Sequence, residues 1–139
     1  DDHTALKEIY RILKPRGIAH IEVPADPACF DLYDEVLMHF RRYRLKSLLA
    51  MARKTGFVVR SATHLGFLIY PGFRLVKFRN RMLYSALPLI EKQAVVKRHI
   101  NSTGSSLAMQ IALGMELNFG GSLRFPFGIR VVVKLCKPS

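Results

Sequence analysis

The sequence between Leu6 and Pro24 constrains the fold most, because it encodes a helix, a tight turn and a strand in immediate succession. Its first half repeats apolar residues at the spacing of one helical face, namely Leu6, Ile9, Tyr10 and Leu13. Pro15 cannot continue a helix and Gly17 tolerates a positive φ, so we expect the helix to span residues 2–14. Residues 18–23 are a short apolar run, which is typical of a strand buried on both faces of a parallel sheet.

The same stretch, LKEIYRILKPRGIAHIEVP, resembles a segment of class I S-adenosylmethionine (SAM)-dependent methyltransferases. In that family a helix with the pattern L-x-E-I-x-R-x-L-K-P-G-G leads into an apolar strand that ends in V-P. Arg16 stands where the family usually has the first of two glycines, and a left-handed arginine there costs about 1 kcal/mol. The resemblance implies an α/β fold, the C-terminal half of a Rossmann-like methyltransferase sheet with a helical insertion before an antiparallel last strand.

The remaining elements follow in the order that this resemblance implies. An apolar stripe predicts a helix over residues 45–55 with Gly56 as its C-terminal stop, and β-branched runs predict strands over 57–63 and 129–136. The last strand is expected to lie antiparallel between the other two. Residues 1–139 would thus form a partial methyltransferase domain, whose parts are an αβαβ core (1–65), a helical insert or lid (66–127) and a terminal strand (128–139).

The long connection after Pro24 contains a D-E-x-x-x-H-x-R-R-Y signature. It resembles a pattern in methyltransferases that accompany surface-polysaccharide and lipid biosynthesis. Histidine can accept a proton near neutral pH, and arginine pairs match carboxylate or phosphate groups. We therefore predict His39 as the catalytic residue and the following substrate-binding residues: Asp34, Arg41, Arg42 and Tyr43. The alternative is a solvated basic loop in which His39 has a structural role.

Two elaborations are expected above one edge of the sheet, because ligands of open parallel sheets bind beyond the carboxyl ends of the strands. The loop after Val23 leaves one such end. The insert leaves another at Leu65, with a basic amphipathic segment beginning near Phe73 and a second helix over 107–119. A cover of this kind would exclude water from a methyl transfer.

The composition of the chain indicates which partners and which cellular location to expect. The formal net charge of +12 favours anionic partners such as phosphates, nucleic acid or a lipid surface. Two cysteines without metal-ligand spacing, Cys29 and Cys136, are expected to be reduced and mostly buried, as in a cytoplasmic protein, and we expect no metal. No apolar run is long enough to span a bilayer, although the insert could contact a membrane peripherally.

The resulting hypothesis is SAM-dependent methyl transfer to an oxygen or nitrogen of an anionic small molecule or a lipid- or sugar-linked acceptor. The resemblance places the residues that bind the cofactor, S-adenosyl-L-methionine, mainly upstream of residue 1, on a glycine-rich loop and an acidic strand end that this sequence lacks. We therefore expect a fragment that is nearly inactive alone. Two alternatives stay open: a basic nucleic-acid-binding or RNA-modifying module, and a peripheral membrane-binding element.

Overall fold

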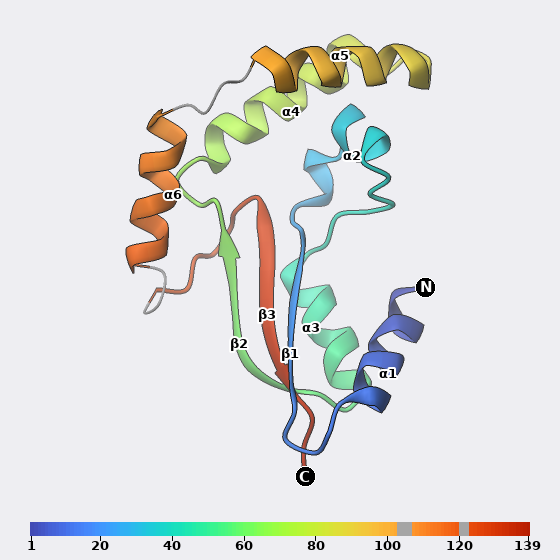
Figure 1. Cartoon of the computed structure of the whole chain (residues 1–139), viewed down its shortest axis with the longest axis vertical. Helices are drawn as coiled ribbons and strands as arrows, with labels where there is room; N and C mark the ends of the chain where they lie inside the picture. The colour runs from blue at the N-terminus through green and yellow to red at the C-terminus, as the bar shows by residue number, and fades with distance from the viewer. Residues whose placement is uncertain (103–106, 120–122) are drawn as a thin grey trace.

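The computed structural model describes residues 1–102, 107–119 and 123–139, and it combines a three-stranded sheet with helices beside and above it (Figure 1). The elements in chain order are α1 (Asp2–Ile12), β1 (Ile18–Pro24), the 3-10 turn η1 (Pro27–Cys29), α2 (Leu32–Val36), α3 (Leu45–Lys54), β2 (Val58–Leu65), α4 (Tyr70–Tyr84), α5 (Leu89–Ser102), α6 (Leu107–Phe119) and β3 (Arg130–Cys136). The two predicted core helices and all three predicted strands are thus present, with ends that differ by one or two residues.

The strand order is β1-β3-β2, and β3 runs antiparallel to both neighbours. In register, Ile21 of β1 lies opposite Val133, and Ala62 of β2 lies opposite the same residue. The prediction that the last strand inserts antiparallel between the two earlier ones is therefore confirmed. β1 and β2 run in the same direction, so their carboxyl ends meet at one edge of the sheet.

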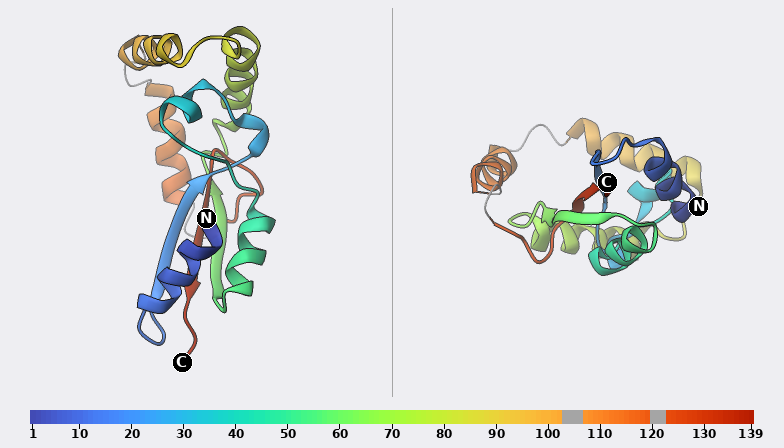
Figure 2. Two further views of the ribbon diagram at one scale, coloured as in Figure 1. Left: turned by 90° about the vertical axis from the view of Figure 1, so that its right-hand side faces the viewer. Right: turned by 90° about the horizontal axis from the view of Figure 1, so that it is seen from below.

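The hydrophobic core lies between one face of the sheet and the helices α1 and α3, which share one side of it (Figure 2). Both helices contribute the apolar stripes expected from their periodicity, with Leu6, Leu48 and Ala52 buried at the centre. Alternate residues of β3 complete this layer, namely Val131, Val133 and Leu135. Tyr10 of α1 contacts the ring of Phe57 edge to face, with 5.0 Å between centroids, which ties α1 to the start of β2.

The expectation that residues 18–23 are buried on both faces is wrong. In β1 the side chains that face the helices are covered, whereas His20 and Glu22 are exposed on the opposite face. Lys134 of β3 lies on that polar face too, and Arg130 pairs there with Glu22. The reason is the period-two alternation of polar residues within the run, which suits a sheet with one solvated face. No described helix covers this face.

The turn between α1 and β1 has its positive φ at Arg16 and not at Gly17, and α1 ends at Ile12, two residues before the predicted end. Arg16 adopts a φ of 64°, and its N–H donates to the carbonyl of Lys137 at 3.0 Å. The N–H of Gly17 closes the turn by donating to the carbonyl of Lys14 at 2.8 Å. Gly56, predicted to end the second core helix, has a φ of 104°. A left-handed residue thus lies between each of these helices and the strand that follows it, Arg16 after α1 and Gly56 after α3.

The insert between β2 and β3 is helical, as predicted, but it contains one helix more than the sequence suggested. α4 and α5 lie beyond the carboxyl ends of β1 and β2, at the opposite end of the molecule from the C-terminus, and α6 lies beside β2 (Figure 1). The expected turn signal after Asn101 lies largely outside the described residues. Glu116 of α6 fixes the base of the insert, because its carboxylate accepts the N–H groups of Gly66 at 2.7 Å and Leu68 at 2.6 Å. None of the described helices is long and apolar enough to cross a membrane.

Candidate functional site

The connection between β1 and α3 begins with a capping box that sets the position of the predicted site residues. Asp31 caps α2, with its carboxylate accepting the N–H of Tyr33 at 3.0 Å. In return, the Asp34 carboxylate accepts the N–H of Asp31 at 3.1 Å. Because both carboxylates are used locally, the short helix is fixed although it has only five residues.

Asp34 is the centre of a buried polar cluster. Its side chain is 1% exposed, and it accepts from Arg42 Nε at 2.8 Å and lies 3.3 Å from His39 Nδ1. Arg42, with a side chain 6% exposed, also donates to the carbonyl of Ala25 at 3.0 Å. Asp34 and Arg42 therefore satisfy each other inside the protein and hold the loop to the end of β1.

His39 is positioned by the same carboxylate but reaches the surface, with 37% of its side chain exposed. Its backbone N–H donates to the carbonyl of Asp34 at 2.8 Å, and Met38 before it has a positive φ of 57°. A carboxylate that already accepts from Arg42 favours the tautomer in which His39 Nδ1 carries the proton. That tautomer leaves Nε2 as the basic nitrogen.

A hollow of about 490 Å³ opens next to His39 at the carboxyl end of β1. Three of the five predicted site residues line it: His39, Arg41 and Tyr43. Arg41 is exposed and pairs with the Asp2 carboxylate at 3.1 Å. Burial, together with the hydrogen bond to Asp2 and its negative charge, raises the pKa of Tyr43, so its phenol stays protonated. The structure thus brings these three residues together at one opening and places Asp34 and Arg42 behind it.

A second cluster, which sequence reasoning missed, joins this loop to the insert. Lys77 of α4 donates to Asp31 at 2.6 Å, and Asn80 donates to its other carboxylate oxygen at 2.9 Å. The Lys77 ammonium also lies over the rings of Tyr33 and Phe73, at 4.7 and 5.1 Å from their centroids. The sequence signal for Asp31 was present, since D-x-x-D before a short helix is a capping-box pattern. The partners on α4 lie more than 40 positions away and had no such signal.

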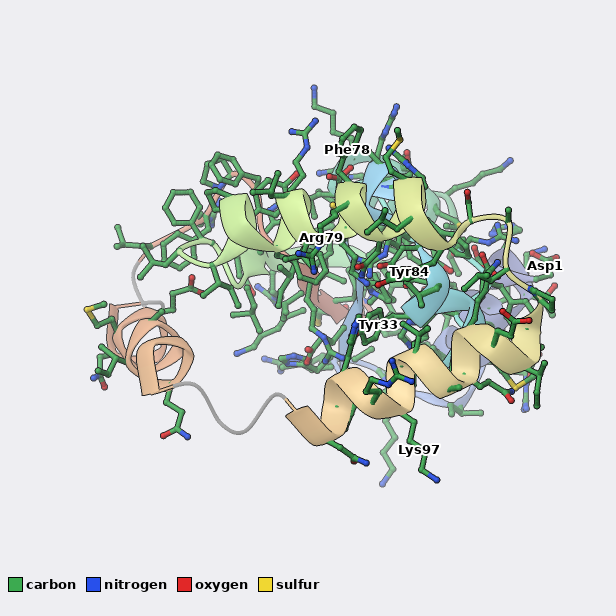
Figure 3. All side chains as sticks on the ribbon, turned by 90° about the horizontal axis from the view of Figure 1, so that it is seen from above. Asp1, Tyr33, Phe78, Arg79, Tyr84 and Lys97 are labelled. Carbon is green, nitrogen blue, oxygen red and sulfur yellow. The ribbon has the colours of Figure 1, made fainter. Side chains whose placement is uncertain are left out.

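α5 is held to the same short helix. Lys92 donates to Glu35 at 2.6 Å, and the Tyr33 hydroxyl lies 3.0 Å from His99 Nδ1. Seen from above, Tyr33 and Tyr84 lie between α4 and α5 (Figure 3). The loop after β1 and the insert after β2 therefore form one cover over the carboxyl edge of the sheet.

Asp26 links the end of β1 to the first turn of α4. Its carboxylate accepts from the Tyr70 hydroxyl at 2.6 Å, from Cys29 Sγ at 3.2 Å and from the N–H of Ala28 at 3.1 Å. Burial opposes ionisation of Asp26, but these hydrogen bonds and the charge of Arg74 outweigh it and hold its pKa below the usual value. Burial and the neighbouring Asp26 in turn raise the pKa of Cys29 and of Tyr70 to about 12 each.

The residues present fit a SAM molecule at one wall only. Asp1 and Asp2 line the hollow, and negative charge there suits a sulfonium cation; the Asp1 carboxylate also caps α1, and that of Asp2 pairs with Arg41. The glycine next to β2 does not form a ligand cradle, since a Cβ at Gly66 would lie 2.3 Å from the side chain of Ile129. The described residues offer no group of three or more His, Cys, Asp or Glu side chains suited to a metal ion.

Comparisons with known proteins give a distant structural likeness. No family model matches the chain, and no curated protein matches it in sequence. Among solved structures, the chain is similar to phosphoethanolamine N-methyltransferase 2 of Haemonchus contortus, solved with phosphomonomethylethanolamine and S-adenosylhomocysteine. The match has a TM-score of 0.44 and 17% sequence identity, and it covers 100% of this chain and 31% of that one. The chain thus spans about a third of the length of that methyltransferase.

Proposed function

We propose that this chain forms the acceptor-side part of a SAM-dependent methyltransferase, which transfers a methyl group to an oxygen or nitrogen of an anionic acceptor. The observation that carries the proposal is the strand order β1-β3-β2 with the last strand antiparallel in the middle. This order is what the resemblance of the Leu6–Pro24 stretch to the family implies for its final three strands. The acceptor class is a small molecule or a lipid- or sugar-linked group.

The hollow supports this proposal by its position. In α/β sheets the ligand site lies beyond the carboxyl ends of the strands, and the hollow opens where β1 ends at Pro24. The cover formed by α2, α4 and α5 lies above the same edge (Figure 1). When bound, SAM would supply the methyl group, and the Asp1 and Asp2 wall would face its cationic sulfur.

Each residue at the opening has a chemical role in the proposal. His39 Nε2 takes the proton of the acceptor nucleophile, and Asp34 holds the imidazole in the tautomer that this requires. Arg41 and Tyr43 grip the anionic part of the acceptor, the first by charge and the second by turning its phenol hydrogen from Asp2 to the acceptor. Arg42 does not reach the acceptor but keeps Asp34 in place. Positioning the two reactants contributes several kcal/mol in reactions of this kind.

The test uses the protein expressed from its complete reading frame, with tritiated SAM and a panel of phosphorylated amines, sugars and lipid-linked acceptors. We expect His39→Gln to lower kcat about a hundredfold with little change in KM for SAM. This loss should shrink at high pH, where the acceptor ionises by itself. Arg41→Ala should instead raise KM for the acceptor about tenfold or more.

The matched control is Arg44→Ala, an exposed arginine three residues further along the chain and outside the lining of the hollow. It should leave both constants unchanged. Wild-type kinetics in both the His39 and Arg41 variants would mean that the loop is a solvated surface feature. A complete protein that transfers no methyl group to any acceptor in the panel would overturn the proposal itself.

A further inference from the structure

α4 is amphipathic, but unlike an ordinary surface helix it turns polar residues toward the protein and an apolar stripe toward the outside. The side chains that it turns toward α2 and η1 include Lys77 and Asn80, both buried, between Phe73 and Tyr84. These four positions recur at the i, i+4, i+7, i+11 spacing of one helical face. The face that packs on the protein therefore carries a charge and an amide, satisfied by Asp31.

The outward face of α4 is apolar. Its stripe has the same spacing but is displaced by two residues, which is about half a turn, and consists of Pro71, Leu75, Phe78 and Met82. Leu75 and Met82 are each 69% exposed and Phe78 is 52% exposed. Other large apolar side chains close to the turn into α5 are exposed too, namely Leu83, Leu89 and Ile90. Exposed apolar area of this extent marks an interaction surface.

Positive charge borders the stripe. Arg74 and Arg81 lie on one flank of it and Arg79 lies on the other, all three exposed, and α4 contains no acidic residue. The Arg81 guanidinium lies 5.9 Å from the ring centroid of Phe78, at the border between charge and apolar surface. Viewed from above, Phe78 points away from α5 on the outer side of the helix (Figure 3). An apolar strip between rows of arginine matches the arrangement of helices that lie in a membrane interface.

A hollow continues the strip at the first turn of α4. It measures about 640 Å³ and is lined by Tyr70, Pro71, Arg74, Leu75, Phe78 and Phe127. Phe127 reaches it from the segment before β3 and contacts Tyr70 at 5.1 Å between ring centroids. The lining is thus aromatic and aliphatic with a single cation, a composition that accepts an acyl chain beneath an anionic headgroup.

We propose that the outward face of α4, with the turn into α5, docks on an anionic lipid bilayer. The choice of a bilayer rests on charge complementarity, since the exposed arginines and the net charge of +12 favour an anionic surface. It rests equally on the apolar stripe. A face that binds nucleic acid would be a continuous basic surface, whereas this face has Leu75, Phe78 and Met82 at its centre. The inference does not depend on methyl transfer and stands if that proposal fails.

A single tryptophan tests the docking directly, because the chain has none of its own. Phe78→Trp should shift its emission to shorter wavelength with vesicles of equal parts phosphatidylglycerol and phosphatidylcholine, and brominated phosphatidylcholine should quench it. Pure phosphatidylcholine vesicles should produce little shift. The control is Ile12→Trp, which places the reporter at an exposed apolar residue of α1, where neither shift nor quenching is expected.

Matched variants separate the two contributions in vesicle co-sedimentation. Leu75→Ser with Met82→Ser should weaken binding about tenfold or more. Arg74→Gln with Arg79→Gln should weaken binding to the anionic vesicles about thirtyfold, with a loss that vanishes at high salt. Lys46→Gln with Arg53→Gln removes the same charge from α3, where both residues are exposed, and should change binding less than about threefold.

Three outcomes would overturn the inference. One is vesicle binding that the Leu75 and Met82 variant retains in full. Another is a stable dimer by light scattering that this variant dissociates, since the face would then bind a second copy of the chain. The third is binding to single-stranded RNA together with no spectral shift of Phe78→Trp on vesicles. All substituted side chains are exposed, so each variant should keep its fold, and an unchanged circular dichroism spectrum checks that its helix content is retained.

Discussion

Arg41 and Arg42 are adjacent in the sequence but lie in different surroundings. Arg42 is buried against Asp34 and the end of β1, while Arg41 is 61% exposed and pairs with Asp2 across the hollow. Breaking a buried ion pair leaves an uncompensated charge, whereas an exposed pair contributes little to stability. The two residues are therefore expected to separate a positioning role from a binding role.

Arg42→Ala should lower the free energy of unfolding by about 3 kcal/mol, because the Asp34 carboxylate loses its closest cation. Arg41→Ala should lower it by less than about 1 kcal/mol. Urea unfolding followed by circular dichroism measures both. Equal effects of the two substitutions would mean that Arg42 is not a structural residue and that it is available to a ligand.

Cys29 predicts how stability depends on alkaline pH. Burial first, and then the hydrogen bond to and charge of Asp26, raise its pKa from an ordinary 9.0 to about 12 in the folded protein. Above pH 9 the unfolded chain loses the thiol proton while the folded chain keeps it, so the stability present below pH 9 decreases as the pH rises toward 12. Urea midpoints at pH 8 and pH 10 should show this decrease. Cys29→Ala should show a smaller one, and an equal decrease in both proteins would contradict the assignment.

At the scale of elements, the sequence predicts what local patterns encode. The helix–turn–strand at Leu6–Pro24 follows from periodicity and from the residues of the turn, and the observed α1 and β1 agree with it. The position of the hollow beside His39 can be predicted in part from the sequence, because the direction of β1 places the loop that contains His39 at the carboxyl edge of the sheet. The ion pairs of Asp31 with Lys77 and of Glu35 with Lys92 could not be predicted, because each joins residues 46 or 57 positions apart without a local signal.

The two left-handed residues between helix and strand, Arg16 and Gly56, give a reciprocal prediction. Arg16 has a φ of 64°, so Arg16→Gly should stabilise the protein by about 0.5–1 kcal/mol. Gly56 has a φ of 104° and a Cβ there would lie 3.3 Å from the ring of Tyr10, so Gly56→Ala should destabilise it by about 1–2 kcal/mol. Thermal unfolding of both variants provides the measurement. The changes in stability of the two variants should have opposite signs. If Arg16→Gly destabilised the protein, the arginine side chain itself would support the turn.

At the scale of the whole molecule, the described residues combine a firmly held cover with a three-stranded sheet that is open at both sides. The cover is held together by ion pairs and by Glu116 at its base, whereas β1 and β2 are both edge strands within the described residues. The polar face of the sheet, with His20, Glu22 and Lys134, has no described layer over it. The described residues therefore form a surface at the carboxyl edge of the sheet, in which the hollow beside His39 opens.

That geometry sets the expected affinity for SAM. The hollow offers the Asp1 and Asp2 carboxylates, but the sequence contains neither the glycine-rich loop nor the acidic strand end that the resemblance implies for the cofactor. Residues 1–139 alone should accordingly bind SAM more weakly than about 1 mM in isothermal titration calorimetry. Micromolar affinity of residues 1–139 would show instead that the hollow beside His39 is itself a complete cofactor site, built differently from that of the family which the sequence resembles.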